Sequence, residues 1–153
     1  MPSTPKDVEA AVDKAVRILN AAAQTRAGLE RKLARAGFAP ATVEAACDRV
    51  EAIGYVNDRA YAEATVNRRQ EQGRGVRVIA SELRQKGIDR ALVDELMGKV
   101  SVEEQVDGAT ELARKLLLRN PDQPRQRERV TGTLMRRGYA PWVARKALER
   151  ASG

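Results

Sequence analysis

The stretch Leu29-x3-Leu33-x3-Gly37-Phe38 decides the fold, because its pattern recurs twice further along the chain. The other two copies are Ile79-x3-Leu83-x3-Gly87-Ile88 and Val130-x3-Leu134-x3-Gly138-Tyr139. Two apolar residues four positions apart lie on one face of a helix. Glycine tolerates the left-handed conformation that ends a helix, and the apolar residue after it packs back on the last turn. Each copy therefore predicts a helix that ends at its glycine.

The residues that follow each glycine repeat as well. Pro40, Arg90 and Pro141 each stand three positions after their glycine, and proline is preorganised for the first position of a helix. We therefore expect an all-α fold of three tandem three-helix repeats that form an elongated, curved helical array. The repeats are expected at residues 7–56, 57–100 and 101–153, after a disordered N-terminus at residues 1–6.

The composition argues against an enzyme. The chain has no histidine, which removes the usual general base and most zinc sites. Its single cysteine, Cys47, aligns with Met97 and Leu148 of the other repeats, so we interpret it as a core side chain. No phosphate-binding loop and no carboxylate pair placed for acid–base work is present. We expect no catalytic residue, no cofactor and no metal.

The charge of the chain points to an acidic partner. The net charge is +7, of which residues 1–56 contribute +1, residues 57–100 contribute +2 and residues 101–153 contribute +4. Such an excess suits a polyanion, nucleic acid first, although plain solubility is the alternative. No apolar run is long enough to span a membrane and no signal peptide is evident. We expect a cytoplasmic protein without membrane partners.

Arginines lie opposite the apolar stripe of the second helix in two repeats. The helical spacing places Arg74, Arg77 and Arg84 on one face in repeat two. In repeat three it places Arg125, Arg129 and Arg136 on one face, flanked by Arg127 and Arg137. In repeat one, only Arg31 and Arg35 lie on the corresponding face of the second helix. Arginine forks bind phosphates or carboxylates. We expect this face to bind the partner; an ordinary solvated helix face is the alternative.

No aromatic residue lies among the arginines between Arg114 and Arg137, so a nucleic-acid site here would be unspecific. Tyr61 could serve as a platform for a base. We favour instead a half-buried position for Tyr61, on the same stripe as Thr65 and Arg68. Trp142 follows Pro141 at a helix start, where packing between repeats explains it better than binding.

The middle of the chain resembles the RecX regulators of bacterial recombinases. The run Gly54-Tyr55-Val56-Asn57-Asp58, followed by Tyr61, is similar to the most recognisable motif of that family. Arg69, Gly75, Arg77-Val78-Ile79, Glu82-Leu83 and Lys86-Gly87-Ile88 match the next block of the family in order and spacing. Two departures lie in repeat one, at Gly28 and at Ala21-Ala22-Ala23, where the family often has Glu and a more basic stretch.

The resemblance implies a monomeric protein that lodges in the groove of a RecA filament on single-stranded DNA. It implies modulation, usually inhibition, of strand exchange, ATP hydrolysis and coprotease activity, and hence a role in DNA repair and the SOS response. The residues expected to contact the filament or its DNA are Arg68, Arg69, Arg74, Arg77, Arg84, Lys86, Arg125, Arg127, Arg129, Arg136 and Arg137. Two other hypotheses remain open: a sequence-independent DNA-binding protein that acts without the recombinase, and a helical-repeat adaptor for another protein.

Overall fold

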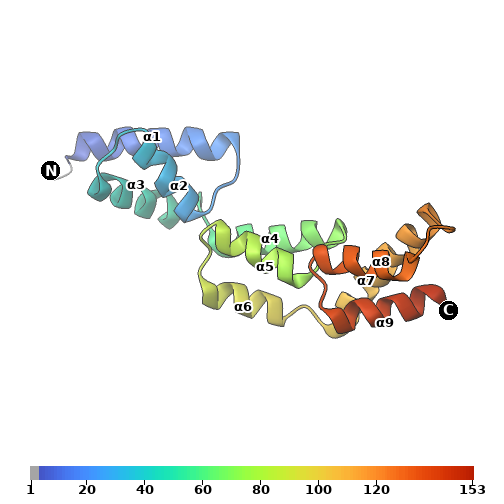
Figure 1. Ribbon diagram of the computed structural model, residues 1–153. Coiled ribbons are helices and arrows are strands. Elements are labelled where there is room, and N and C mark those ends of the chain that lie inside the picture. The colour runs from blue at the N-terminus through green and yellow to red at the C-terminus, as the bar shows by residue number, and fades with distance from the viewer. Residues whose placement is uncertain (1–3) are drawn as a thin grey trace. The chain divides into compact units, whose positions relative to one another are not determined.

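A computed structural model describes residues 4–153, with the backbone alone for Pro5. These residues form nine α-helices and no β-strand, which confirms the expected all-α fold (Figure 1). The helices are α1 (Pro5–Ala21), α2 (Arg26–Arg35), α3 (Pro40–Ala52), α4 (Asp58–Glu71), α5 (Val76–Gln85), α6 (Arg90–Gly98), α7 (Val102–Arg119), α8 (Gln126–Arg136) and α9 (Pro141–Ser152). Within residues 4–153, no helix combines the length and apolar character that crossing a lipid bilayer requires.

The first helix begins earlier than the sequence suggested. The Thr4 hydroxyl accepts a hydrogen bond from the Asp7 amide at 3.2 Å, and the Asp7 carboxylate accepts one from the Thr4 amide at 3.4 Å. This reciprocal capping box satisfies amides that the start of a helix leaves unpaired. The expected disorder of residues 1–6 is therefore wrong for residues 4–6, and residues 1–3 lie outside the described part of the chain.

Glycines end the helices as predicted. Gly37, Gly87 and Gly138 have φ values of +100°, +83° and +107°, and Gly54 and Gly73 are also left-handed. After Gly138 the Tyr139 amide donates to the Leu134 carbonyl at 3.1 Å, so the chain folds back on the last turn. Pro40, Arg90 and Pro141 each begin the next helix.

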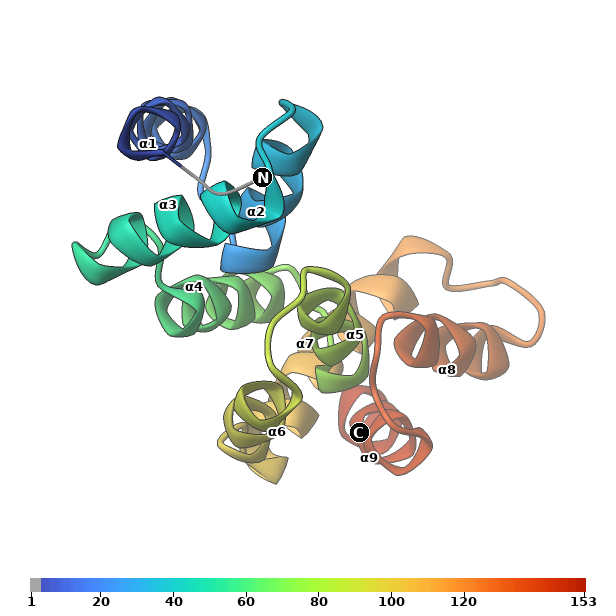
Figure 2. The ribbon, with the colours of Figure 1, turned by 90° about the vertical axis from the view of Figure 1, so that its left-hand side faces the viewer.

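Two cores hold the outer helices together. Helices α1–α3 enclose Ala11, Ala15, Leu29, Leu33, Val43, Ala46, Cys47, Val50 and Val56. Helices α7, α8 and α9 lie together, and α7 and α9 pair most extensively (Figure 2). They enclose Val106, Ala109, Ala113, Val130, Leu134, Tyr139, Ala140, Val143, Ala144, Ala147 and Leu148. Cys47 is 1% exposed, as expected of a core side chain, and burial raises the pKa of its thiol to about 11.

The chain divides into two compact units. Of the described residues, the first holds 4–62 together with 85–89, and the second holds 63–84 and 90–153. This division does not follow the repeat boundaries expected at 57 and 100. The start of the middle repeat and its turn after α5 are bonded to the start of α2, through Asp58 and the Lys86 carbonyl, and this explains the difference.

The turn after α5 packs on the start of α2 within the first unit. Thr25 caps α2 by accepting from the Gly28 amide at 3.0 Å, and its hydroxyl donates to the Lys86 carbonyl at 2.7 Å. A Cβ atom on Gly87 would lie only 2.4 Å from the Cβ of Ala27. The junction therefore requires glycine here for two reasons, the left-handed backbone and the close approach.

The second unit contains an equivalent junction, made by the turn after α8 and the start of α5. The Gly75 amide donates to the Arg137 carbonyl at 2.8 Å, and the Arg77 amide donates to the Gly138 carbonyl at 3.1 Å. A Cβ atom on Gly75 would lie 2.5 Å from the Gly138 carbonyl carbon. Backbone carbonyls thus replace the side-chain cap at the start of α5.

Candidate partner interface

Two arginines of α5 are placed as the sequence predicted. Ile79 and Leu83 are fully buried and fix the orientation of the helix. Arg77 and Arg84 are exposed, and their guanidinium groups have no hydrogen-bond or ion-pair partner within residues 4–153. Both are therefore available to an acidic partner.

Arg74 does not belong to this exposed face, so its predicted position is wrong. It precedes α5, in the turn that follows the left-handed Gly73, and its amide donates to the Arg69 carbonyl at 2.9 Å. The side chain is half-buried, and its Nε atom is buried without a hydrogen-bond partner in the described part of the chain. The spacing argument fails here because the helix begins only at Val76.

Helix α8 carries two arginines that share a surface. Arg129 and Arg136 line one hollow of about 390 Å³ beside the end of α7, and Glu128 lines it too. The Arg129 Nε donates to the Pro124 carbonyl at 3.2 Å, and an Arg136 nitrogen donates to Thr133 Oγ1 at 3.1 Å. These bonds use only part of each guanidinium, so donors remain for a partner.

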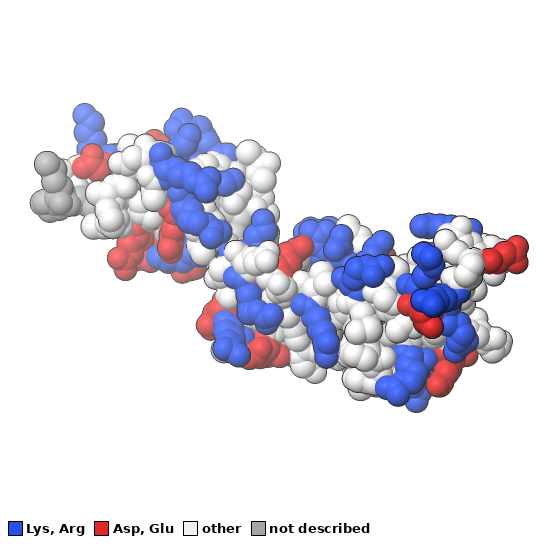
Figure 3. All heavy atoms as spheres, viewed as in Figure 1, with Lys and Arg blue, Asp and Glu red and all other residues white. Residues whose placement is uncertain are grey.

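The other arginines around α8 are placed differently. Arg125 is wrongly predicted as helical: it is the N-cap of α8, with φ of +55°. Arg127 is exposed and donates to the Ser152 hydroxyl at 3.1 Å, which ties α8 to α9. Arg137 is half-buried, and its carbonyl takes part in the junction with Gly75. Basic side chains spread over α5 and α8, with fewer acidic ones between them (Figure 3).

The two arginines at the end of α4 differ in their contacts. Arg69 pairs with Glu82 of α5 through a 3.0 Å contact between Nε and Oε1, and its Nη1 donates to Gln72 at 2.8 Å. Since both partners of the ion pair are about a quarter exposed, this contact fixes α4 against α5. Arg68 and Lys86 are exposed and their side chains have no partner in the described residues.

The motif residues are mainly structural. Gly54 is left-handed at the end of α3, and Tyr55, directly after it, is 54% exposed. Asn57 caps α4 by accepting from the Ala60 amide at 3.0 Å. Tyr61 is half-buried, as predicted, while Gly75 and Gly87 each sit in a junction.

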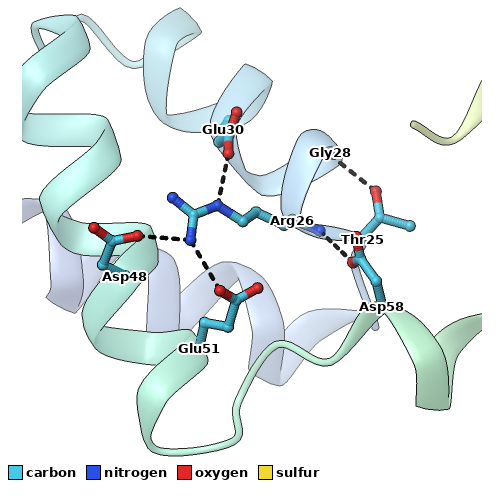
Figure 4. A network of polar contacts seen from close by, with 7 residues as sticks. All are labelled: Thr25, Arg26, Gly28, Glu30, Asp48, Glu51 and Asp58. Carbon is cyan, nitrogen blue, oxygen red and sulfur yellow. Dashed lines mark hydrogen bonds and ion pairs between the residues drawn. The ribbon is translucent and has the colours of Figure 1, made fainter. Parts of the chain in front are cut away.

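Sequence reasoning missed the network around Arg26 (Figure 4). The guanidinium contacts Glu30 at 2.8 Å, Asp48 at 2.7 Å and Glu51 at 3.0 Å, while Asp58 accepts from the Arg26 amide at 2.8 Å. Hydrogen bonds, first to Glu30 and then to Asp48, raise the pKa of Arg26. Only the Arg26–Glu30 spacing of four residues was visible in the sequence.

Comparison with known proteins decides the family. Residues 57–97 match the family model described as "RecX, second three-helix domain", and residues 11–49 match "RecX, first three-helix domain". A regulatory protein RecX from Mycobacterium avium (strain 104) is 34% identical over 146 residues, which cover 93% of this chain and 84% of the relative. The chain belongs to the RecX family of regulatory proteins.

Other RecX proteins extend the similarity over almost the whole chain. The regulatory protein RecX of Streptomyces coelicolor is 34% identical over 152 residues, covering 96% of this chain and 80% of that protein. The crystal structure of RecX from Lactobacillus salivarius has the same fold, with a TM-score of 0.87 and 22% identity, over 97% of this chain and 99% of that one. The resemblance seen in the sequence is thus confirmed.

Proposed function

We propose that this chain binds the RecA recombinase filament on single-stranded DNA and inhibits its strand exchange, ATP hydrolysis and coprotease activity. Membership of the RecX family of regulatory proteins carries the proposal. The expected site of action is the cytoplasm, with the protein acting as a monomer in DNA repair and the SOS response. The division into repeats at 7–56, 57–100 and 101–153 is part of the same proposal.

Exposed arginines support a contact with the filament. A nucleoprotein filament offers both protein carboxylates and DNA phosphates, and guanidinium groups bind either one through paired hydrogen bonds. Arg77 and Arg84 of α5 are exposed without partners in the described chain, and Arg129 and Arg136 of α8 have spare donors. We name these four residues the arginine face and assign the partner contact to them.

A salt titration tests the proposal against a protein that acts through naked DNA. Binding to single-stranded DNA weakens steeply with salt, with a slope of about 0.7 for each neutralised phosphate. RecA ATPase activity on single-stranded DNA would be measured at a salt concentration where this chain no longer binds the DNA alone. Continued inhibition supports a direct filament contact. Inhibition that disappears together with DNA binding would favour the sequence-independent DNA-binding protein.

A further inference from the structure

A basic cleft lies in the first unit, whereas the residues of the arginine face belong to the second. It has a volume of about 480 Å³ and forms between the loop after α1, the exposed side of α2, the start of α4 and the turn after α5. Its lining residues are Ala22, Ala23, Gln24, Thr25, Gly28, Arg31, Lys32, Arg35, Tyr61 and Lys86. Four of these are cations and none is acidic, which distinguishes the cleft from the hollow beside Glu128.

The four cations are free to bind a ligand. Arg31, Lys32 and Arg35 are exposed on α2, and their side chains have no partner among the described residues. Lys86 reaches the cleft from a different part of the chain, and it is held there by the bond from Thr25 to its carbonyl. Basic side chains gather over α2 on this face of the first unit (Figure 3). Unpaired like charges repel one another, so a bound anion would relieve that repulsion.

An aromatic side chain stands beside these cations. Tyr61 is half-buried on the first turn of α4 and is one of the residues that line the cleft. Ala22, Ala23 and Gly28 have small side chains or none, which leaves the space open. A positive groove with an aromatic platform is the arrangement that binds single-stranded nucleic acid: cations contact the phosphates while a base stacks on the ring. An acidic peptide would use the cations but not the platform.

We propose that this cleft binds one nucleotide unit of single-stranded DNA, with its base on Tyr61 and its flanking phosphates on Arg31, Lys32, Arg35 and Lys86. The proposal deepens the proposed function, because it gives the first unit a contact with the strand inside the filament. It also assigns binding to the repeat whose sequence carries the smallest charge. The size of the cleft suits a nucleotide, since small-molecule sites measure about 300–1,000 Å³.

The test uses naked DNA, so its failure is distinguishable from failure of the filament proposal. Fluorescence anisotropy would compare a labelled oligothymidylate with an abasic oligonucleotide of equal length and charge. The parent chain should bind the thymidylate at least about fivefold more tightly, as one stacked base requires. Tyr61→Ala should lose this preference and Tyr61→Phe should keep it. Equal binding of the two oligonucleotides by the parent chain would overturn the proposal without any variant.

Charge variants supply the second arm of the test. Replacing Arg31, Lys32 and Arg35 by alanine should reduce the salt slope of thymidylate binding by about 2. The matched control, with Lys14, Arg17 and Arg49 replaced by alanine, removes the same charge from the first unit without touching the cleft lining and should leave the slope unchanged. Equal slopes for the two variants would refute the cleft. An oligoglutamate peptide that displaces the DNA at equal charge would also refute it, in favour of an acidic protein partner. Circular dichroism melts check that each variant is folded.

Discussion

Replacing Gly87 by alanine tests the junction between the turn after α5 and the start of α2. The residue has φ of +83°, where an L-residue suffers strain of about 1–2 kcal/mol. The added Cβ would also meet the Ala27 Cβ at 2.4 Å, which is an overpacked contact costing about 1–3 kcal/mol more. We therefore expect Gly87→Ala to lower the free energy of unfolding by about 2–5 kcal/mol. Valine should cost more because it is β-branched.

Gly37→Ala is the matched control for the strain alone. Gly37 is also left-handed, with φ of +100°, but nothing lies within 4 Å of the position of its Cβ. Urea unfolding followed by circular dichroism measures both variants, and hydrogen exchange of the α2 peptide locates the effect. Adding Ala27→Gly to Gly87→Ala should remove the clash, so the double variant should lose less than the sum of the single losses. If Gly87→Ala costs no more than Gly37→Ala, the turn does not pack on α2 as described.

Three further predictions follow from other contacts. Arg26→Met should lower the free energy of unfolding in urea by about 1–2 kcal/mol, because three carboxylates lose their common cation; an unchanged unfolding curve would show the network to be inert. Gly75→Ala should cost at least about 2 kcal/mol, because its Cβ would strike the Gly138 backbone at 2.5 Å, and a melting temperature equal to that of the parent would disprove the close approach. Burial raises the pKa of the Cys47 thiol from 9.0 to about 11. Between these two pH values the thiol ionises in the unfolded chain but not in the folded one, so the free energy of unfolding should fall as the pH rises from 9.0 to about 11. Cys47→Ala should flatten that decline, and an identical pH profile would contradict the assignment.

Much of the fold could be predicted because its signals are local. A helix that ends at Gly37, Gly87 or Gly138 is specified by apolar spacing and by a residue that tolerates positive φ. Helix starts at Pro40 and Pro141 are equally local. The start of α1 after its N-cap Thr4 was not predicted, although both residues of the capping box, Thr4 and Asp7, can be read from the sequence.

The interface was harder to predict, because it depends on where helices begin and on what neighbouring segments cover. Arg74 and Arg125 were assigned to helices by spacing alone, but each precedes its helix by one or two residues. Arg69 was expected to contact the partner, but the fold places its side chain in an ion pair with Glu82. The cleft beside Tyr61 joins residues from four segments, so no local pattern could have revealed it.

The most direct test of the central claim is RecA ATPase activity on single-stranded DNA, titrated with charge-reversed variants of the arginine face. Arg77 and Arg84, or Arg129 and Arg136, would be replaced by glutamate; Arg145 and Lys146, exposed on α9, provide the matched control. Exposed substitutions of this kind change stability by about 0.5 kcal/mol or less, so lost inhibition would reflect lost contact. We predict inhibition by the parent and the control and none by the two face variants. Equal inhibition by all four proteins would contradict the account.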